Sequence, residues 1–269
     1  MAAAAAPLRL HCLGTGAGAT HIYDAEPSSA WALESAGEYL LLCDLGAGVC
    51  RSCLGHLGEV PSTIFISHNH ADHASELPVV LAVEALRKGR RMRVLAAPDV
   101  LARLREHRMH ELRSTGRPLD DFAEWIEAPS GCPVRVPAAC AGPALEVTTH
   151  LAAHSELCYG AVIRCGEAAV GWTADSAFDP RLLQTLTVGT RLAIVDARRD
   201  GGREHASFEE IRKYVASTPG VAFLGDSVAG GADCSVAIIG YGARHEAPQL
   251  EDGIPETAVL RPGTTLTLA

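Results

Sequence analysis

Short apolar runs alternate with glycine-rich or polar loops along most of the chain, and a few longer segments have helical periodicity. Runs of about four to eight apolar and β-branched residues bounded by turn residues are typical of strands. They predict strands at 8–13, 29–33, 38–44, 63–67, 94–97, 146–150, 159–164, 168–173 and 192–196. Helices are predicted at 50–58, 76–88, 99–113 and 207–215, and a hairpin broken at Pro262-Gly263 is predicted at 258–268.

Two of these helices have start signals. Asp99 stands where a side chain can cap the helix that runs towards Arg113. Ser207 is followed three residues later by Glu210, the spacing of a capping box. Each half of the chain thus has strands followed by helices, which predicts two layered α/β halves facing one another. Since no repeat and no clear linker is visible, we expect a single domain over residues 1–269.

Composition and charge narrow the class of protein. Hydrophobic residues make up 48% of the 269 residues, enough for a large core, and the net charge is −9. A negative surface repels a phosphate backbone, so general nucleic-acid binding is disfavoured. The basic run at 87–93 is interpreted as a solvated helix end, with substrate docking as the alternative.

Cysteine usage and hydropathy indicate the setting. Of nine cysteines, only Cys50 and Cys53 have metal-like spacing, and no second pair completes a four-sulfur site. Buried thiols acting as small hydrophobes explain the others better. No apolar stretch of about 20 residues could cross a bilayer, and the alanine-rich start lacks the features of a signal peptide. We therefore expect a cytoplasmic protein without membrane contact.

The segment His68-Asn69-His70-Ala71-Asp72-His73, directly after a predicted strand, carries the chemistry. In extended backbone, side chains two residues apart point to the same side, so His68 and His70 can bind the same metal ion. Where the chain turns into the next helix, Asp72 and His73 swing towards a neighbouring point. One loop can thus supply ligands to two adjacent ions. Imidazole and carboxylate suit zinc, and also iron or manganese.

This loop resembles the His-x-His-x-Asp-His signature of the metallo-β-lactamase superfamily, and the resemblance extends over nearly the whole chain. It implies a four-layer αβ/βα sandwich. It also implies a third histidine, a bridging aspartate after an apolar strand and a last histidine, matched by His154, Asp175 and His205. His150 is a rival to His154. The metal ligands implied are His68, His70, Asp72, His73, His154, Asp175 and His205.

Within the superfamily, the chain most resembles the ribonuclease Z-like branch and its phosphodiesterase relatives. The opening Leu13-Gly14-Thr15-Gly16-Ala17-Gly18, the segment Asp44-Leu45-Gly46-Ala47-Gly48 and His205-Ala206-Ser207 match that branch. The tRNA-processing enzymes have a His-Glu-Ala-Thr segment where this chain reads Val195-Asp196-Ala197-Arg198, and the chain has no long glycine- and proline-rich arm. These departures and the negative charge disfavour tRNA maturation.

The resemblance implies an enzyme with two divalent metal ions that hold a hydroxide for attack on phosphorus or carbonyl carbon. Asp72 would hold one ion and accept the proton of the nucleophile. We expect a hydrolase acting on a small ester-like molecule such as a phosphodiester. The alternatives are a lactonase or thioesterase, an iron-dependent oxygenase and a non-catalytic binding protein. A homodimer is compatible with the sequence. Arg198 and Arg199 could bind an anionic group, although solvated surface arginines are the simpler interpretation.

Overall fold

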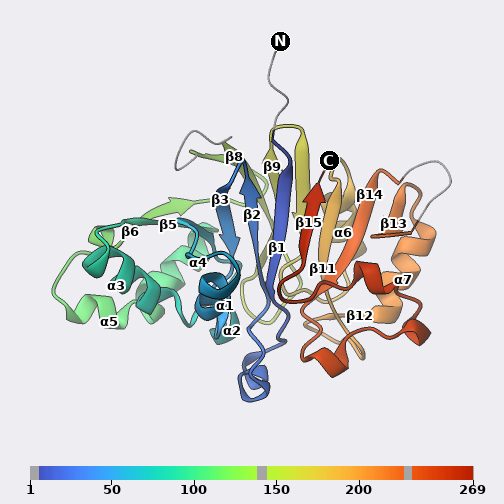
Figure 1. Ribbon diagram of the computed structural model, residues 1–269, viewed down its shortest axis with the longest axis horizontal. Coiled ribbons are helices and arrows are strands. Elements are labelled where there is room, and N and C mark those ends of the chain that lie inside the picture. Colours follow the sequence, from blue (N-terminus) through green and yellow to red (C-terminus); the bar gives the residue numbers. More distant parts are fainter. Residues whose placement is uncertain (1–5, 138–143, 227–231, 269) are drawn as a thin grey trace, which may run out of the picture.

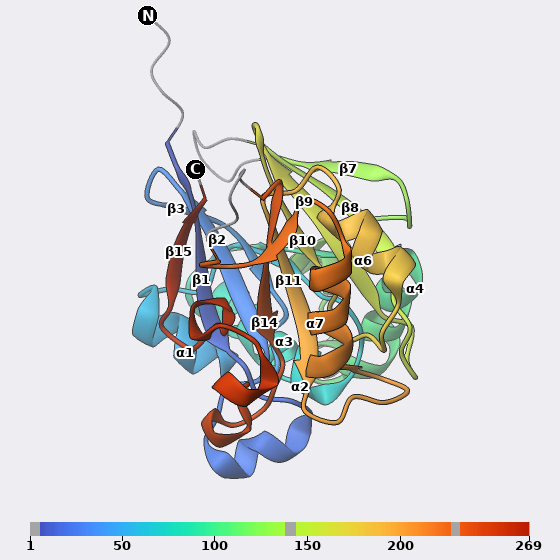
Figure 2. The same ribbon diagram turned by 90° about the vertical axis from the view of Figure 1, so that its right-hand side faces the viewer.

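A computed structural model of the chain describes residues 6–137, 144–226 and 232–268. Two β-sheets face each other, and helices cover the outer face of each sheet, which gives four layers (Figures 1 and 2). The α/β architecture predicted as an αβ/βα sandwich is therefore confirmed.

The first sheet has the strand order β15-β1-β2-β3-β4-β5-β6. Its strands pair antiparallel from β15 to β3 and parallel from β3 to β6. They are β1 (Leu8–Gly14), β2 (Ala30–Ser35), β3 (Glu38–Cys43), β4 (Thr63–Phe65), β5 (Met92–Ala96), β6 (Ala123–Glu127) and β15 (Thr265–Leu268).

The second sheet has the strand order β13-β14-β11-β10-β9-β8-β7, and β12 pairs with β11 beside this path. Pairing is antiparallel from β7 to β10 and parallel from β10 to β13. The strands are β7 (Pro133–Val136), β8 (Leu145–Leu151), β9 (Tyr159–Cys165), β10 (Ala168–Trp172), β11 (Leu192–Arg198), β12 (Ala206–Ser207), β13 (Val221–Phe223) and β14 (Cys234–Ile239).

Helices pack on the outer faces of the sheets. The α-helices are α1 (Val49–His56), α2 (Ala71–Ala74), α3 (Leu77–Arg87), α4 (Pro98–Arg103), α5 (His110–Ser114), α6 (Pro180–Thr187) and α7 (Phe208–Ser217). A π-helix, η2 (Leu104–Arg108), joins α4 to α5. Short 3₁₀ turns are η1 (Ala19–Asp24), η3 (Leu119–Asp121), η4 (Arg244–Glu246), η5 (Leu250–Asp252) and η6 (Glu256–Ala258).

Alternation along the strands divides the core between the layers. In β2, Trp31 and Leu33 point into the core between the sheets, whereas Ala30 and Ala32 join the core under the helices. This follows from the two-residue period of a strand. Trp172 from the second sheet meets Trp31 edge-on with ring centroids 5.7 Å apart, so aromatic contacts join the two halves.

Several sequence-based predictions need correction. The helix expected to run to Arg113 is interrupted by the π-helix η2, and Ala97 rather than Asp99 is its N-cap. Asp99 instead accepts a hydrogen bond from the Tyr159 hydroxyl at 2.8 Å. The hairpin at 258–268 is also wrong, because β15 pairs with β1 rather than with the segment before Pro262. The Ser207 capping box is confirmed.

The cysteines of the described residues are all free. Cys53 is buried in the core beneath the first sheet, as expected of a small hydrophobe, and Cys50 is half-buried. Cys140 lies outside the described residues. No helix within the described ranges is both long enough and apolar enough to cross a membrane.

Candidate metal centre

The predicted metal-binding residues gather where strands of both sheets end. In the first sheet, β3 and β4 are parallel and are followed by Asp44 and by the metal loop, which we define as residues 68–73. In the second sheet, β10 and β11 are parallel; Asp175 follows β10, and Asp196 lies near the end of β11. The carboxyl ends of parallel strands share one edge of a sheet, which explains how residues distant in sequence meet.

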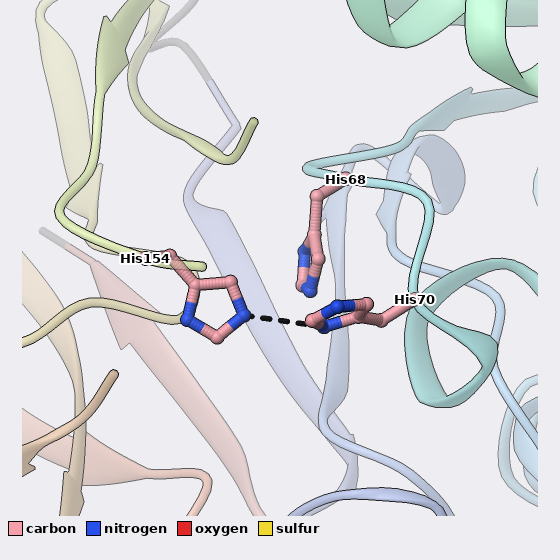
Figure 3. Close-up of side chains that lie close together, drawn as sticks. All are labelled: His68, His70 and His154. Atoms are coloured by element: carbon pink, nitrogen blue, oxygen red, sulfur yellow. Dashed lines mark hydrogen bonds between the residues drawn. The ribbon is translucent and has the colours of Figure 1, made fainter. Parts of the chain in front are cut away.

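His68, His70 and His154 form the first group of candidate ligands. One ligand atom from each lies within 4.8 Å of the others. Their rings point towards one another from two separate loops, as Figure 3 shows. His154 Nε2 is 3.2 Å from His70 Nδ1, so two ring nitrogens face each other. His68 Nε2 is buried and has no hydrogen-bond partner in the described structure.

The second group surrounds Asp175. Its Oδ2 lies 3.3 Å from His73 Nε2 and 3.9 Å from His205 Nδ1. His68, His73 and Asp175 form one set of close ligand atoms, and Asp175, Asp196 and His205 form another. Asp175 therefore stands between histidines from both halves of the sandwich.

Asp72 lies at the edge of this group. Its Oδ2 is 3.4 Å from His73 Nε2, but none of the close sets among the described residues includes it. Burial opposes ionisation of Asp72, yet contact with His73 holds the pKa of its carboxyl below the ordinary value. The structure thus places an ionised carboxylate beside the cluster, as a proton acceptor requires.

Asp44 orients two histidines of the metal loop. Its buried carboxylate accepts hydrogen bonds from the Ser67 backbone N–H at 2.8 Å and from the Ser67 hydroxyl at 2.7 Å. His73 Nδ1 donates to the same carboxylate at 2.5 Å. Since the Ser67 hydroxyl donates to Asp44, its oxygen can accept from His68 Nδ1 at 2.9 Å. Both rings are therefore held through Nδ1, which leaves Nε2 as the atom that can bind a metal ion.

In the second half of the molecule, two histidines are also held through Nδ1. His205 Nδ1 donates to Asp196 at 2.7 Å, and His154 Nδ1 donates to the Glu204 carbonyl at 3.2 Å. Burial and the neighbouring Asp175 carboxylate raise the pKa of Asp196 to about 6. These contacts leave Nε2 of His205 and His154 available as ligand atoms.

The unequal surroundings of the histidines shift their pKa values in opposite directions. Burial disfavours the charged form of His73, but the carboxylates of Asp175 and Asp44 outweigh it and hold the pKa well above its ordinary range. Burial and the neighbouring His73 hold the pKa of His68 well below that range. His68 is therefore neutral, the form that binds a metal.

Close backbone packing supports the metal loop. A Cβ on Gly46 would lie 1.7 Å from the carbonyl oxygen of Asp72, so only glycine fits there. Arg108, the last residue of the π-helix, donates through Nε to Asn69 Oδ1 at 2.9 Å and through Nη2 to the Asn69 carbonyl at 2.7 Å. The guanidinium therefore holds the backbone of the loop in place between His68 and His70. Such π-helices often occur at functional sites.

Sequence reasoning missed Asp44, Asp196, Ser67 and Arg108. A signal for the two aspartates was present, because a lone carboxylate at the end of an apolar strand is costly to bury unless it has a partner. The rival ligand His150 pairs with Gly160 in the β8–β9 ladder and belongs to none of the close ligand sets found among the described residues.

The basic run at 87–93 is largely neutralised. Arg90 pairs with Glu84 at 2.8 Å and with Glu59 at 3.3 Å, and Arg93 pairs with Glu124 at 3.4 Å. Arg93 and Glu124 lie on β5 and β6 and Glu84 on α3, whereas Arg90 and Glu59 lie in the loops before β5 and β4. The favoured interpretation of the run as a solvated helix end therefore fits the structure better than substrate docking.

The arrangement is similar to that of solved structures. The metallo-β-lactamase fold protein YhfI from Bacillus subtilis has 17% identity and a TM-score of 0.67, covering 97% of this chain and 99% of its own. Human tRNase Z, short form, has 14% identity and a TM-score of 0.65, covering 96% and 98%. A diphosphatase from the PhnP family has 14% identity and a TM-score of 0.63, covering 97% and 98%.

At these identities the likeness confirms the metallo-β-lactamase fold. No curated protein matches the sequence significantly. The sequence model of the family described as anti-Pycsar protein Apyc1 matches residues 8–221, a range that contains all seven predicted metal ligands. Because the match extends over well more than half of its length, the chain belongs to the anti-Pycsar protein Apyc1 family.

Proposed function

We propose that this protein is a dinuclear metal-dependent hydrolase that acts on a small ester-like substrate, in the first instance a phosphodiester. The observation that carries the proposal is the hydrogen bonding of the imidazoles. His68, His73, His154 and His205 are held through Nδ1, so each directs Nε2 to a common space. A buried Nε2 without a hydrogen-bond partner, such as that of His68, lowers the stability of the fold unless a ligand binds it.

The donor set fits two adjacent cations. His68, His70 and His154 would hold one, and Asp72, His73 and His205 would hold the other. Asp175 would bridge them, since one carboxylate oxygen for each cation offsets their mutual repulsion. Imidazoles with a few carboxylates favour zinc, with iron or manganese as alternatives. When bound, the cations would lower the pKa of water and stabilise negative charge on the substrate.

The residues of the chain would complete the reaction. Asp72, kept ionised by His73, would accept the proton of the attacking water. A bond forms between the water oxygen and phosphorus, and the bond from phosphorus to the leaving oxygen breaks. The leaving oxygen takes up a proton, so a diester and water give a monoester and an alcohol. One structural neighbour is a diphosphatase from the PhnP family, so the fold can carry chemistry at phosphorus.

A small substrate fits the surface better than nucleic acid. The net charge is −9, and the arginines Arg90 and Arg93 of the basic run are paired with glutamates. We therefore expect weak tRNA binding that is lost at moderate salt.

The experiment compares metal content and activity. Purified protein should carry close to two transition-metal ions per chain, measured by elemental analysis after dialysis. Asp175→Ala should lose at least one ion and its activity. Asp120→Ala is the matched control, because the Asp120 side chain is 64% exposed and belongs to none of the close ligand sets among the described residues. Turnover should be sought with bis-p-nitrophenyl phosphate, lactones and thioesters. Full metal content and activity in Asp175→Ala would contradict the bridging role, and turnover of lactones or thioesters alone would favour a carbonyl hydrolase.

A further inference from the structure

Two adjacent arginines at the end of β11 have very different surroundings. Arg199 donates to Asp252 at 3.0 Å and lies over the Phe208 ring at 5.8 Å, so surface contacts hold it away from the cluster. Arg198 points to the candidate metal centre, with Nη2 4.0 Å from Asp175 Oδ2. Its Nε is buried and has no hydrogen-bond partner in the part of the chain that the structure describes. The Arg198 side chain is still 29% exposed, so a ligand can reach it.

The position of Arg198 is electrostatically costly. Its nearest carboxylate is Asp175, which already faces His73 at 3.3 Å and is the proposed bridge between cations. With both oxygens of Asp175 engaged there, the guanidinium would stand beside positive charge, and the neighbouring Asp196 carboxylate already accepts a hydrogen bond from His205 at 2.7 Å. A buried N–H without a partner adds a further cost. Both costs are relieved by an anion that contacts the cations and the guanidinium together.

We propose that Arg198 binds an anionic oxygen of the substrate and selects phosphoryl esters over uncharged carbonyl esters. The inference rests on the proposed function and narrows its substrate class. A phosphodiester keeps one negative charge shared by two free oxygens, one of which can lie on the cations while the other accepts from Arg198. A guanidinium suits this contact because its planar donors match the oxygens of phosphate. A lactone or thioester has no such charge and gains nothing from Arg198.

The test measures affinity for inorganic phosphate as well as turnover. Wild type, Arg198→Met, Arg198→Lys and the control Arg199→Met are loaded with zinc, and the metal content of each is verified. Phosphate binding is then measured by calorimetry, and kcat/KM is measured with bis-p-nitrophenyl phosphate and with uncharged p-nitrophenyl acetate. Arg198→Met should weaken phosphate binding roughly 10- to 100-fold, the effect of losing charge-assisted hydrogen bonds. Arg198→Lys should restore part of it, and Arg199→Met should resemble wild type.

The two substrates separate an anion-binding role from a structural one. Arg198→Met should lose kcat/KM for the diester but not for the acetate, whereas a distorted site would lose both. The proposal is overturned if phosphate does not bind wild type, if Arg198→Met binds it as well as wild type does, or if Arg199→Met loses as much. Should Arg198→Met fail to fold, Arg198→Lys and Arg198→Gln carry the same comparison. Phosphate binding that depends on Arg198 without turnover of any ester would contradict the proposed hydrolase and leave the anion site standing.

Discussion

Asp44 offers the sharpest test of how the histidines are oriented, because an isosteric change to Asn replaces the acceptor Oδ2, which faces His73 Nδ1 and the Ser67 hydroxyl, with a donor. In Asp44→Asn, the amide oxygen can still accept from the Ser67 backbone N–H, now at 2.8 Å. The amide NH₂ then faces His73 Nδ1, which can accept only if the proton moves to Nε2. Nε2 is the atom that lies 3.3 Å from Asp175, so the variant blocks the proposed ligand atom while keeping its shape.

The expected loss of metal affinity is worked from the hydrogen bond between Asp44 and His73, the contact that leaves His73 Nε2 free to bind a metal ion. Removing a hydrogen bond to a charged group costs about 1.5 to 3 kcal/mol. This agrees with the 10- to 100-fold loss of metal affinity typical when a residue supporting a ligand is changed, about 1.4 to 2.8 kcal/mol. The metal-free protein should lose less stability, because burial already raises the pKa of Asp44 and the neutral amide avoids that cost of desolvation.

Competition with a chromogenic zinc chelator measures the affinity, and thermal unfolding of chelator-treated protein measures the stability. Asp120→Asn, an exposed carboxylate 3.6 Å from Arg105, is the control and should change neither. The reasoning is refuted if Asp44→Asn binds zinc as wild type does while its metal-free form melts several degrees lower. That result would make Asp44 a structural residue with no effect on the ligand atom.

Three further predictions concern the same site. His154→Ala should lose metal and turnover, whereas His150→Ala should keep both ions after identical dialysis; the reverse pattern would reassign the third ligand. Gly46→Ala should destabilise the fold by about 1 to 3 kcal/mol in urea unfolding, since its Cβ would overlap the metal-loop backbone. Gly55→Ala, in open space on α1, should instead stabilise by about 0.5 to 1 kcal/mol, and equal effects would contradict the packing argument. The rise in Tm on adding zinc should be larger at pH 8 than at pH 6, because the raised pKa of His73 obliges the cation to displace a proton. In the metal-free protein, the stability from that proton is fully present below the ordinary pKa of 6.5 and is lost as pH rises through the raised value, so a pH-independent metal effect would argue against His73 as a ligand.

Local patterns made part of the site predictable. The metal loop could be located because four metal-capable side chains follow one strand, and the capping box because Ser207 and Glu210, three positions apart, define it. His154 and Asp175 came only from the resemblance, since neither has a distinctive sequence context. The π-helix that positions Arg108 beside Asn69 could not be predicted from the sequence, because its wider turn depends on packing rather than on local propensity.

Asp44 and Asp196 were the more instructive omissions. Each occurs at the end of an apolar strand, one in each sheet, and each holds Nδ1 of a histidine, His73 and His205. Sequence alone shows the cost of burying such a carboxylate, but it cannot show the partner, which lies 29 residues away for Asp44 and 9 for Asp196. Matching carboxylate–histidine pairs on both sides of Asp175 explain why the ligands become complete only when the sheets pack together. Metal binding and packing of the two halves are then linked, because the free energy of one contributes to the other.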